Sequence, residues 1–484
     1  MNSPARSHVP GVPGSGTRRW VSRLIPPLIF VVLVCLPVGL CCGATYYVSP
    51  SGDDANPGTR LLPWATPGYG SKQLRPGDTL VIRSGTYYLS RYWDDMITPG
   101  SGVAGKWITI RGEGPRRPIL AGRDGLPAAA DISGCRFVRL KNLEITSDRG
   151  AWFDKGISAT GGVLRDSVLA DLYIHHLDWE GIDISDTLNV TIKNCTVTFC
   201  GGGGIGGPAG THGGIRNLTV ERCNLSYAGH YYRGGSGDDR PYDRPDGLGL
   251  ERSPGPLVIR ATRALHNRGD GLDSKMNLTR IDRCIVANND CDGVKLWGTG
   301  SVVRNTLVYG TGDGNPASEW TSLVISGTRN ARFELVNVAL DDNRTRRAYS
   351  MTVQYDDPGI PISLAMRNCI VSHGYGAAYI GPSVNFTCES NLFKRGTAEP
   401  VQVYANGREY TARQVNTGAL GRGNRCAEPR FVRPAWGSAG DYHLRPGSPA
   451  IDNGTAFRAP AVDLDGKTRP SGAGYDIGPY EFRG

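Results

Sequence analysis

Residues 269–297 read GDGLDSKMNLTRIDRCIVANNDCDGVKLW, and this stretch contains the same short pattern twice: an aspartate, a glycine and an apolar residue in succession. Five glycines, each followed by an apolar residue, share this register: Gly181, Gly204, Gly247, Gly271 and Gly293. Their spacings are 23, 43, 24 and 22 residues, so apart from one insertion the chain returns to one structural position about every 23 residues. A repeat of this period predicts a solenoid.

The residues between these glycines favour strands over helices. Short β-branched runs such as Val190-Thr191-Ile192 alternate with turn residues, and 67 glycines in 484 residues argue against a helical repeat. No long stretch has apolar residues at a period of 3.6. Three short strands in 22 to 24 residues describe one coil of a β-helix. We therefore predict an all-β fold, a single-stranded right-handed parallel β-helix with a cap at each end.

The repeat also divides the chain into segments. Residues 1–44 have the composition of a signal peptide, and residues 45–106 are expected to form the N-terminal cap and the first coils. The regular β-helix is expected over residues 107–399. Residues 400–484 lose the repeat and are expected to form a C-terminal cap or tail, since the end coils of a solenoid would otherwise expose apolar surface.

The first 44 residues predict export. Arginines at positions 18, 19 and 23 precede an apolar run over residues 24–40, and Cys42-Gly43-Ala44 supplies the small residues of a cleavage site. An uncleaved membrane anchor is the alternative reading. We predict a secreted, monomeric protein with no stable membrane association after cleavage.

The charge balance argues against one class of partner. The formal net charge is +9 at pH 7, and removal of a leader with four arginines and no acids lowers it to +5. No cluster of lysine and arginine with interleaved aromatic residues appears, so a nucleic-acid partner is not expected. Four cysteines recur in register and predict a buried packing column rather than disulfides or a metal site: Cys195, Cys223, Cys284 and Cys369.

Charged residues flank the repeated glycines in two columns. Asp246, Asp270 and Asp292 each stand directly before a glycine, and Asp273 and Lys295 stand two residues after one. Side chains alternate along a strand, so Asp273 and Lys295 are expected to face outward on adjacent coils about 5 Å apart. Stacked carboxylates at that spacing repel one another unless a cation lies between them.

Calcium is the cation that this pattern suits, because Ca²⁺ takes six to eight oxygen ligands. Aspartate followed by glycine is also a common turn sequence, so each aspartate alone could merely shape a bend. Turn chemistry does not require the outward lysine. A cation beside a lysine base suits the elimination reaction that cleaves a uronic-acid polymer. Lys275 is the second choice of base, and Trp297 is placed to stack on a sugar; both are candidate substrate-binding residues.

These residues resemble polysaccharide lyase family 9, the calcium-dependent pectate lyases. The resemblance rests on Asp270-Gly271-Leu272-Asp273 one coil before Gly293-Val294-Lys295-Leu296, with Asp246-Gly247-Leu248 one coil earlier. It implies a right-handed β-helix, Asp246, Asp270 and Asp273 as calcium ligands, Lys295 as the Brønsted base, and an acidic polysaccharide such as pectate as substrate. The family cluster usually opens with two adjacent aspartates, whereas this chain has Gly269 at the first, so Asp292 is the expected replacement ligand.

Two other functions remain open. A glycoside hydrolase on the same fold would use two carboxylates, such as Asp270 and Asp292, as acid and base. A noncatalytic carbohydrate-binding protein would use the aspartate columns only as structural calcium sites. β-Helix architecture is shared by several such classes and does not choose between them.

Overall fold

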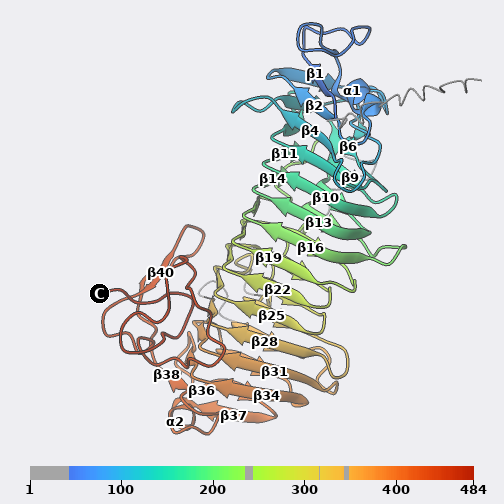
Figure 1. Cartoon of the computed structure of the whole chain (residues 1–484). Helices are drawn as coiled ribbons and strands as arrows, with labels where there is room; N and C mark the ends of the chain where they lie inside the picture. Colours follow the sequence, from blue (N-terminus) through green and yellow to red (C-terminus); the bar gives the residue numbers. More distant parts are fainter. Residues whose placement is uncertain (1–42, 235–243, 316, 343–347) are drawn as a thin grey trace, which may run out of the picture. The chain divides into compact units, whose positions relative to one another are not determined.

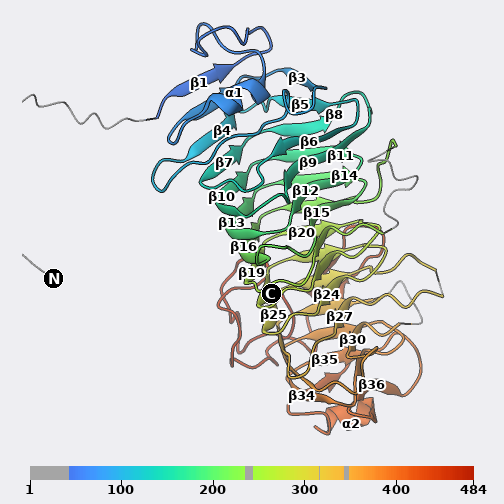
Figure 2. The same ribbon diagram turned by 90° about the vertical axis from the view of Figure 1, so that its right-hand side faces the viewer.

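The computed structural model describes residues 43–484 except 235–243, 316 and 343–347, so nearly all of the predicted leader lies outside the described residues. Three long sheets of parallel strands wind along one axis, and each coil contributes one strand to each sheet in turn (Figures 1 and 2). The coil over residues 279–296, for example, supplies β22, β23 and β24 to the three sheets. The predicted all-β parallel solenoid is confirmed.

The strands group by sheet as follows. Sheet A contains β1 (Thr45–Val48), β2 (Thr79–Ile82), β4 (Ile108–Gly112), β7 (Val138–Lys141), β10 (Leu164–Ala170), β13 (Thr187–Lys193), β16 (Ile215–Glu221), β19 (Leu257–Arg260), β22 (Thr279–Asp282), β25 (Ser301–Arg304), β28 (Arg332–Val336), β31 (Ile362–Arg367) and β34 (Val384–Glu389). Sheet B contains β3 (Thr86–Leu89), β5 (Ile119–Gly122), β8 (Glu144–Ser147), β11 (Tyr173–Leu177), β14 (Thr196–Cys200), β17 (Asn224–Ser226), β20 (Arg263–Leu265), β23 (Ile285–Ala287), β26 (Leu307–Tyr309), β29 (Ala339–Asp341), β32 (Ile370–Ser372), β35 (Leu392–Lys394) and β38 (Arg425–Cys426). Sheet C contains β6 (Leu126–Asp131), β9 (Phe153–Ala159), β12 (Glu180–Ile184), β15 (Gly203–Gly207), β18 (Leu248–Leu250), β21 (Leu272–Ser274), β24 (Val294–Leu296), β27 (Leu323–Ile325), β30 (Met351–Val353), β33 (Ala378–Ile380), β36 (Val401–Ala405) and the antiparallel β37 (Arg408–Thr411).

The repeated glycines occupy one column at the start of the sheet C strands. Strand pairing places Ile182 beside Ile205, and Leu272 beside Val294, so the five glycines are equivalent as their spacing predicts. None of the five, all within the described residues, has a positive φ. Glycine is needed at this position because a side chain would overlap the core: a Cβ at Gly181 would lie 2.1 Å from Val197 Cγ1.

The solenoid is filled by one continuous apolar core, and its two ends are closed differently. Helix α1 (Pro67–Gln73) covers the first coil, and Trp64 beside it is buried in the core. At the other end, the hairpin of β36 and β37 and helix α2 (Ala412–Asn416) follow the last coil, with Val415 fully buried. No helix in the described part of the chain is long and apolar enough to span a membrane.

The rest of the tail, after β38, covers the side of the solenoid rather than its end. Two strands that fall within residues 400–484, β36 and β38, still pair with the preceding coils in sheets C and B. The chain after β38, including β39 (Phe431–Arg433) and β40 (Asp441–Leu444), lies against the outer face of sheet B (Figure 1). Tyr442 and Ile477 pack there in a second core with Leu307 and Ile370. Outward apolar side chains of sheet B are buried in this way.

The described cysteines are all free thiols. The four that recur in register are buried in the core, as predicted for a packing column. Burial raises the pKa of the thiols of Cys284 and Cys369 to about 12, so both remain protonated at neutral pH.

Gly181→Ala is expected to lower the free energy of unfolding by about 1 to 3 kcal/mol, because the added methyl group overlaps Val197 in a closely packed core. Gly359→Ala is the matched control, since nothing lies within 4 Å of its Cβ position. The measurement is the guanidinium denaturation midpoint of each purified variant. Equal midpoints for both variants would contradict a spatial role for the glycine column.

Candidate functional site

The predicted site lies on the outer face of sheet C. Residues two positions after the repeated glycines pair with equivalent residues on the other coils and form one column, which we call the outward column. From the first coils to the last it reads Ser158, Asp183, Gly206, Gly249, Asp273, Lys295, Val324, Thr352, Tyr379 and Tyr404. Asp273 and Lys295 are therefore direct neighbours on β21 and β24, as the alternation of side chains predicts.

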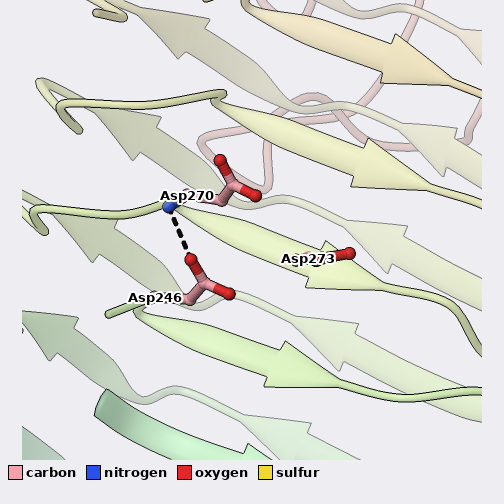
Figure 3. Close-up of side chains that lie close together, drawn as sticks. All are labelled: Asp246, Asp270 and Asp273. Carbon is pink, nitrogen blue, oxygen red and sulfur yellow. Dashed lines mark hydrogen bonds between the residues drawn. The ribbon is translucent and has the colours of Figure 1, made fainter. Parts of the chain in front are cut away.

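The residues directly before the glycines form a second column, which we call the turn column. It reads Lys155, Glu180, Gly203, Asp246, Asp270, Asp292 and Thr321. The Oδ1 atom of each aspartate accepts the backbone N–H of the next residue in this column, at 2.7 Å from Asp270 to Asp246 (Figure 3) and 2.8 Å from Asp292 to Asp270. The turn-shaping role of these aspartates is thus present, and it holds each carboxylate in a defined orientation.

Three of the predicted ligands converge. One carboxylate oxygen from each of Asp246, Asp270 and Asp273 lies within 4.8 Å of the other two (Figure 3). Asp273 is 6 % exposed, and its buried Oδ1 atom has no hydrogen-bond partner among the described residues. A buried carboxylate oxygen without a donor is costly unless a cation or a proton satisfies it. The donor set of hard oxygens therefore fits Ca²⁺.

Asp292 lies outside this group of three. Its Oδ1 accepts the N–H of Thr321 at 2.8 Å, and its Oδ2 lies 3.5 Å from Lys295 Nζ. The ligand expected to replace a missing aspartate at position 269 is thus placed beside the lysine. A side chain at position 269 would itself be obstructed, because a Cβ at Gly269 would lie 2.2 Å from the Arg244 carbonyl oxygen.

Lys295 is held at the centre of the carboxylates. Its Nζ donates to Asp270 Oδ2 at 2.5 Å, and the neighbouring Val294 and Leu296 are buried in the core. Burial lowers the pKa of Lys295, but the charges of Asp270, Asp292 and Asp273 outweigh this and raise it above its usual value. Lys295 is therefore protonated when only these carboxylates surround it.

Burial also raises the pKa values of three acids near Lys295, namely Asp246, Asp273 and Asp292. The carboxyl of Asp273 is raised to about 6, and that of Asp292 to about 7 with a further contribution from the charge of Asp270. The pKa of Asp246 is raised well above its usual range by burial and by Asp270 and Asp273. The cluster thus holds more negative charge than its environment stabilises, which is the condition that a bound cation relieves.

The two weaker candidates lie beside this cluster. Lys275 forms an ion pair with Glu251, and its Nζ lies 3.7 Å from Asp273 Oδ2. The same Nζ lies 5.3 Å from the ring centroid of Trp297. Both side chains are half-buried on the outer face of sheet C, next to the acidic cluster.

A hollow of about 420 Å³ opens on the N-terminal side of the cluster. Glycine at positions 206 and 249 of the outward column makes this space. A Cβ at Gly206 would lie 2.7 Å from Glu180 Cγ, and a Cβ at Gly249 would lie 2.7 Å from Asp246 Oδ2. Asp246 and Asp273 line one part of the hollow, and Glu180 lines another.

Sequence reasoning missed two charged residues near this hollow. Lys155 donates to Asp183 Oδ2 at 2.6 Å, and Glu180 has a buried Oε2 atom with no partner among the described residues. Burial and the charge of Asp183 raise the pKa of Glu180 to about 8. Both residues belong to the turn column, and the signal that could have found Lys155 is Gly156-Ile157, an earlier member of the glycine register.

Sequence reasoning also missed a cavity of about 530 Å³ on the C-terminal side of the cluster. Lys295 and Asp292 line it, together with several aromatic side chains from the segments between β24 and β33: Trp297, Trp320, Tyr349, Tyr355 and Tyr375. The four aromatic residues other than Trp297 lie on coils where Ser322, Ser350 and Ala377 stand in place of the repeated glycine, so the glycine spacing did not point to them.

Comparison with known proteins bears out the fold. Residues 132–327 match the family described as "Right handed beta helix region". An uncharacterized protein of Bacillus subtilis (strain 168), YwoF, is 35 % identical over 80 residues, which is 16 % of the length of each chain. XylC in complex with xylose aligns with a TM-score of 0.58 at 10 % identity, covering 91 % of this chain and 98 % of that one.

The pectate lyase Pel9A also aligns, with a TM-score of 0.48 at 15 % identity, covering 92 % of this chain and 98 % of that one. At these identities the similarity to solved structures concerns architecture. The fold is a right-handed parallel β-helix, as the resemblance noted in the sequence implies.

Glu180→Gln tests the unpaired acid in the hollow. Folding raises the pKa of Glu180 from 4.5 to about 8. Between pH 4.5 and about pH 8 the carboxyl of Glu180 therefore carries a proton in the folded state and has lost it in the unfolded state. The free energy of unfolding of the wild type therefore falls as pH rises from about 4.5 to about 8, by about 1 to 4 kcal/mol from this group. Urea denaturation at pH 5 and pH 8 should show that the free energy of unfolding of Glu180→Gln falls less between these pH values than that of the wild type.

The exposed Glu399 supplies the matched control, Glu399→Gln, which should follow the wild-type pH dependence. Parallel curves for Glu180→Gln and the wild type would contradict a protonated Glu180 in the fold.

Proposed function

We propose that this protein is a secreted polysaccharide lyase that cleaves an acidic, uronic-acid polymer, with pectate as the first candidate, by calcium-assisted β-elimination. The proposed export rests only on the leader sequence. The observation that carries the reaction is the convergence of Lys295 with Asp246, Asp270 and Asp273 on adjacent coils. A lysine fixed on a paired strand beside three carboxylates is the arrangement that this chemistry requires.

Residues of this chain would position both the cation and the lysine base. Asp246, Asp270 and Asp273 would hold the cation, and the backbone N–H groups of Asp270 and Asp292 orient two of these carboxylates. A bound divalent cation supplies positive charge that offsets the carboxylates, lowers the pKa of Lys295 and polarises the uronate carboxylate. The unpartnered Oδ1 of Asp273 supports this assignment.

Lys295 Nζ is the atom proposed to accept the proton. In β-elimination a base removes the proton on the carbon next to the uronate carboxylate, and the electrons of that C–H bond form a carbon–carbon double bond. The bond to the glycosidic oxygen on the adjacent carbon breaks, and that oxygen takes up a proton. Lys295 must be neutral to act, and the buried neighbours Val294 and Leu296 keep its backbone in place.

The geometry disfavours the hydrolase alternative. Hydrolysis needs two carboxyl groups on either side of the scissile bond. Lys295 Nζ lies 2.5 Å from Asp270 Oδ2 and 3.5 Å from Asp292 Oδ2, so a cationic side chain occupies the space that the substrate bond would need. We therefore place elimination ahead of hydrolysis.

Lys295→Ala is expected to reduce elimination by about 10²- to 10⁴-fold, since it removes the base. The measurement is ultraviolet absorbance of the unsaturated product during incubation with polygalacturonate, with calcium or with a chelator. Lys295→Arg should be equally inactive because arginine retains its proton. Lys106→Ala, at an exposed lysine far from sheet C's strands β18 to β24, should keep wild-type activity.

Two outcomes would contradict the reaction. New reducing ends without absorbance would indicate hydrolysis, and binding of the polymer without turnover would indicate a noncatalytic protein. Undiminished elimination by Lys295→Ala would remove the base assignment while leaving the lyase class in place.

Asp273→Asn is expected to weaken calcium binding at least about tenfold, because it removes one of three carboxylate charges. Isothermal calorimetry with calcium chloride measures this without any substrate. Asp124→Asn, at an exposed aspartate on another part of the chain, is the control and should bind as the wild type does. If Asp273→Asn and the wild type bind calcium equally, the cation does not lie between these three aspartates.

A further inference from the structure

The cavity on the C-terminal side of Lys295 continues the proposed active site over two more coils. Its floor carries Val324 and Thr352, which follow Lys295 in the outward column on β27 and β30. Lys295 and Asp292 themselves form part of its lining. A polymer that reaches Lys295 along the column of strands therefore meets this cavity next.

The walls of the cavity are aromatic and partly open to solvent. Tyr355 is 51 % exposed and Tyr375 is 43 % exposed, which is unusual for large apolar rings. Exposed aromatic surface gathered in a concave site marks a ligand-binding surface more often than a structural one. The two tyrosines come from different coils, so their proximity is a product of the fold.

Contacts within the fold hold the rings in place. The ring of Tyr349 lies edge-on to that of Tyr375 at a centroid distance of 6.1 Å. Tyr355 lies edge-on to Tyr379 at 5.1 Å, and Tyr379 stacks on Tyr404 at 4.9 Å with an interplanar angle of 4°. Rings supported in this way lose little side-chain entropy when a ligand packs on them.

The charges in the cavity do not favour recognition of a carboxylate there. Among the described residues that line it, Lys295 is the only base, whereas Asp292, Glu319 and Asp356 are acids. Recognition by the described walls therefore comes from ring faces. The C–H bonds on the face of a pyranose ring pack against an aromatic face, whose surface is electron-rich.

We propose that this cavity is a subsite that binds one pyranose unit of the polymer by stacking on Tyr355 and Tyr375, next to the unit from which Lys295 removes the proton. The proposal rests on the proposed function, because it places the polymer along the outer face of sheet C. It assigns the two sides of the site different tasks. The acidic side binds by charge, and the aromatic side binds by ring shape.

The test measures binding of defined oligogalacturonates and oligoalginates of two to six units by calorimetry, in calcium, in the Lys295→Ala background so that the probe is not consumed. Tyr355→Ala and Tyr375→Ala are each expected to weaken binding of the longer oligomers about 3- to 10-fold. Tyr355→Phe should retain affinity because it keeps the ring. Tyr92→Ala, at a tyrosine 70 % exposed on another part of the chain, is the control and should bind as the parent does.

The outcomes separate this subsite from the lyase reaction. If wild-type protein produces unsaturated products and Tyr355→Ala and Tyr375→Ala bind every oligomer as the Lys295→Ala parent does, the subsite is wrong and the reaction stands. If no elimination occurs but oligomer binding weakens in Tyr355→Ala and Tyr375→Ala, the subsite stands without the reaction. Absence of binding by the parent to every oligomer overturns the subsite. Thermal unfolding of each variant confirms that the fold is intact.

Discussion

The structure depends on strand pairing that keeps a constant register from coil to coil. Each sheet C strand pairs in parallel with the equivalent strand of the next coil, so a residue type repeated in the sequence becomes a straight column in space. The glycine column permits this register because larger side chains would meet core residues such as Val197 or Val286. Everything at the candidate site is positioned relative to that column.

A column of aspartates carries an electrostatic cost that the fold only partly offsets. The backbone N–H groups of successive coils satisfy one oxygen of Asp246, Asp270 and Asp292, and Lys295 pairs with the second oxygens of Asp270 and Asp292. Burial, with a smaller contribution from the charge of Asp270, raises the pKa values of Asp273 and Asp292. Acids and bases with shifted pKa values in a cleft are typical of functional sites.

The outer face of sheet C changes character along its length. Charged residues and two glycines dominate the coils before Lys295, and Val324, Thr352, Tyr379 and Tyr404 follow it. One side chain, Lys295, stands at the border of the two regions and lines the aromatic cavity. A solenoid can vary such a column one coil at a time without disturbing the core, since outward positions do not take part in interior packing.

The sequence by itself determined the coil, the column of glycines, and the neighbours Asp246, Asp270, Asp273 and Lys295, because in a solenoid a fixed spacing along the chain becomes a fixed distance in space. Lys155 and Glu180 follow the same spacing, so the sequence could also have predicted their positions. Tertiary structure alone decided the rest. Trp320, Tyr349 and Tyr375 meet in one cavity on coils that lack the repeated glycine, and the tail covers sheet B through apolar contacts between residues such as Tyr442 and Leu307 that lie far apart in sequence. Such contacts depend on loop path and side-chain packing, which residue spacing does not encode.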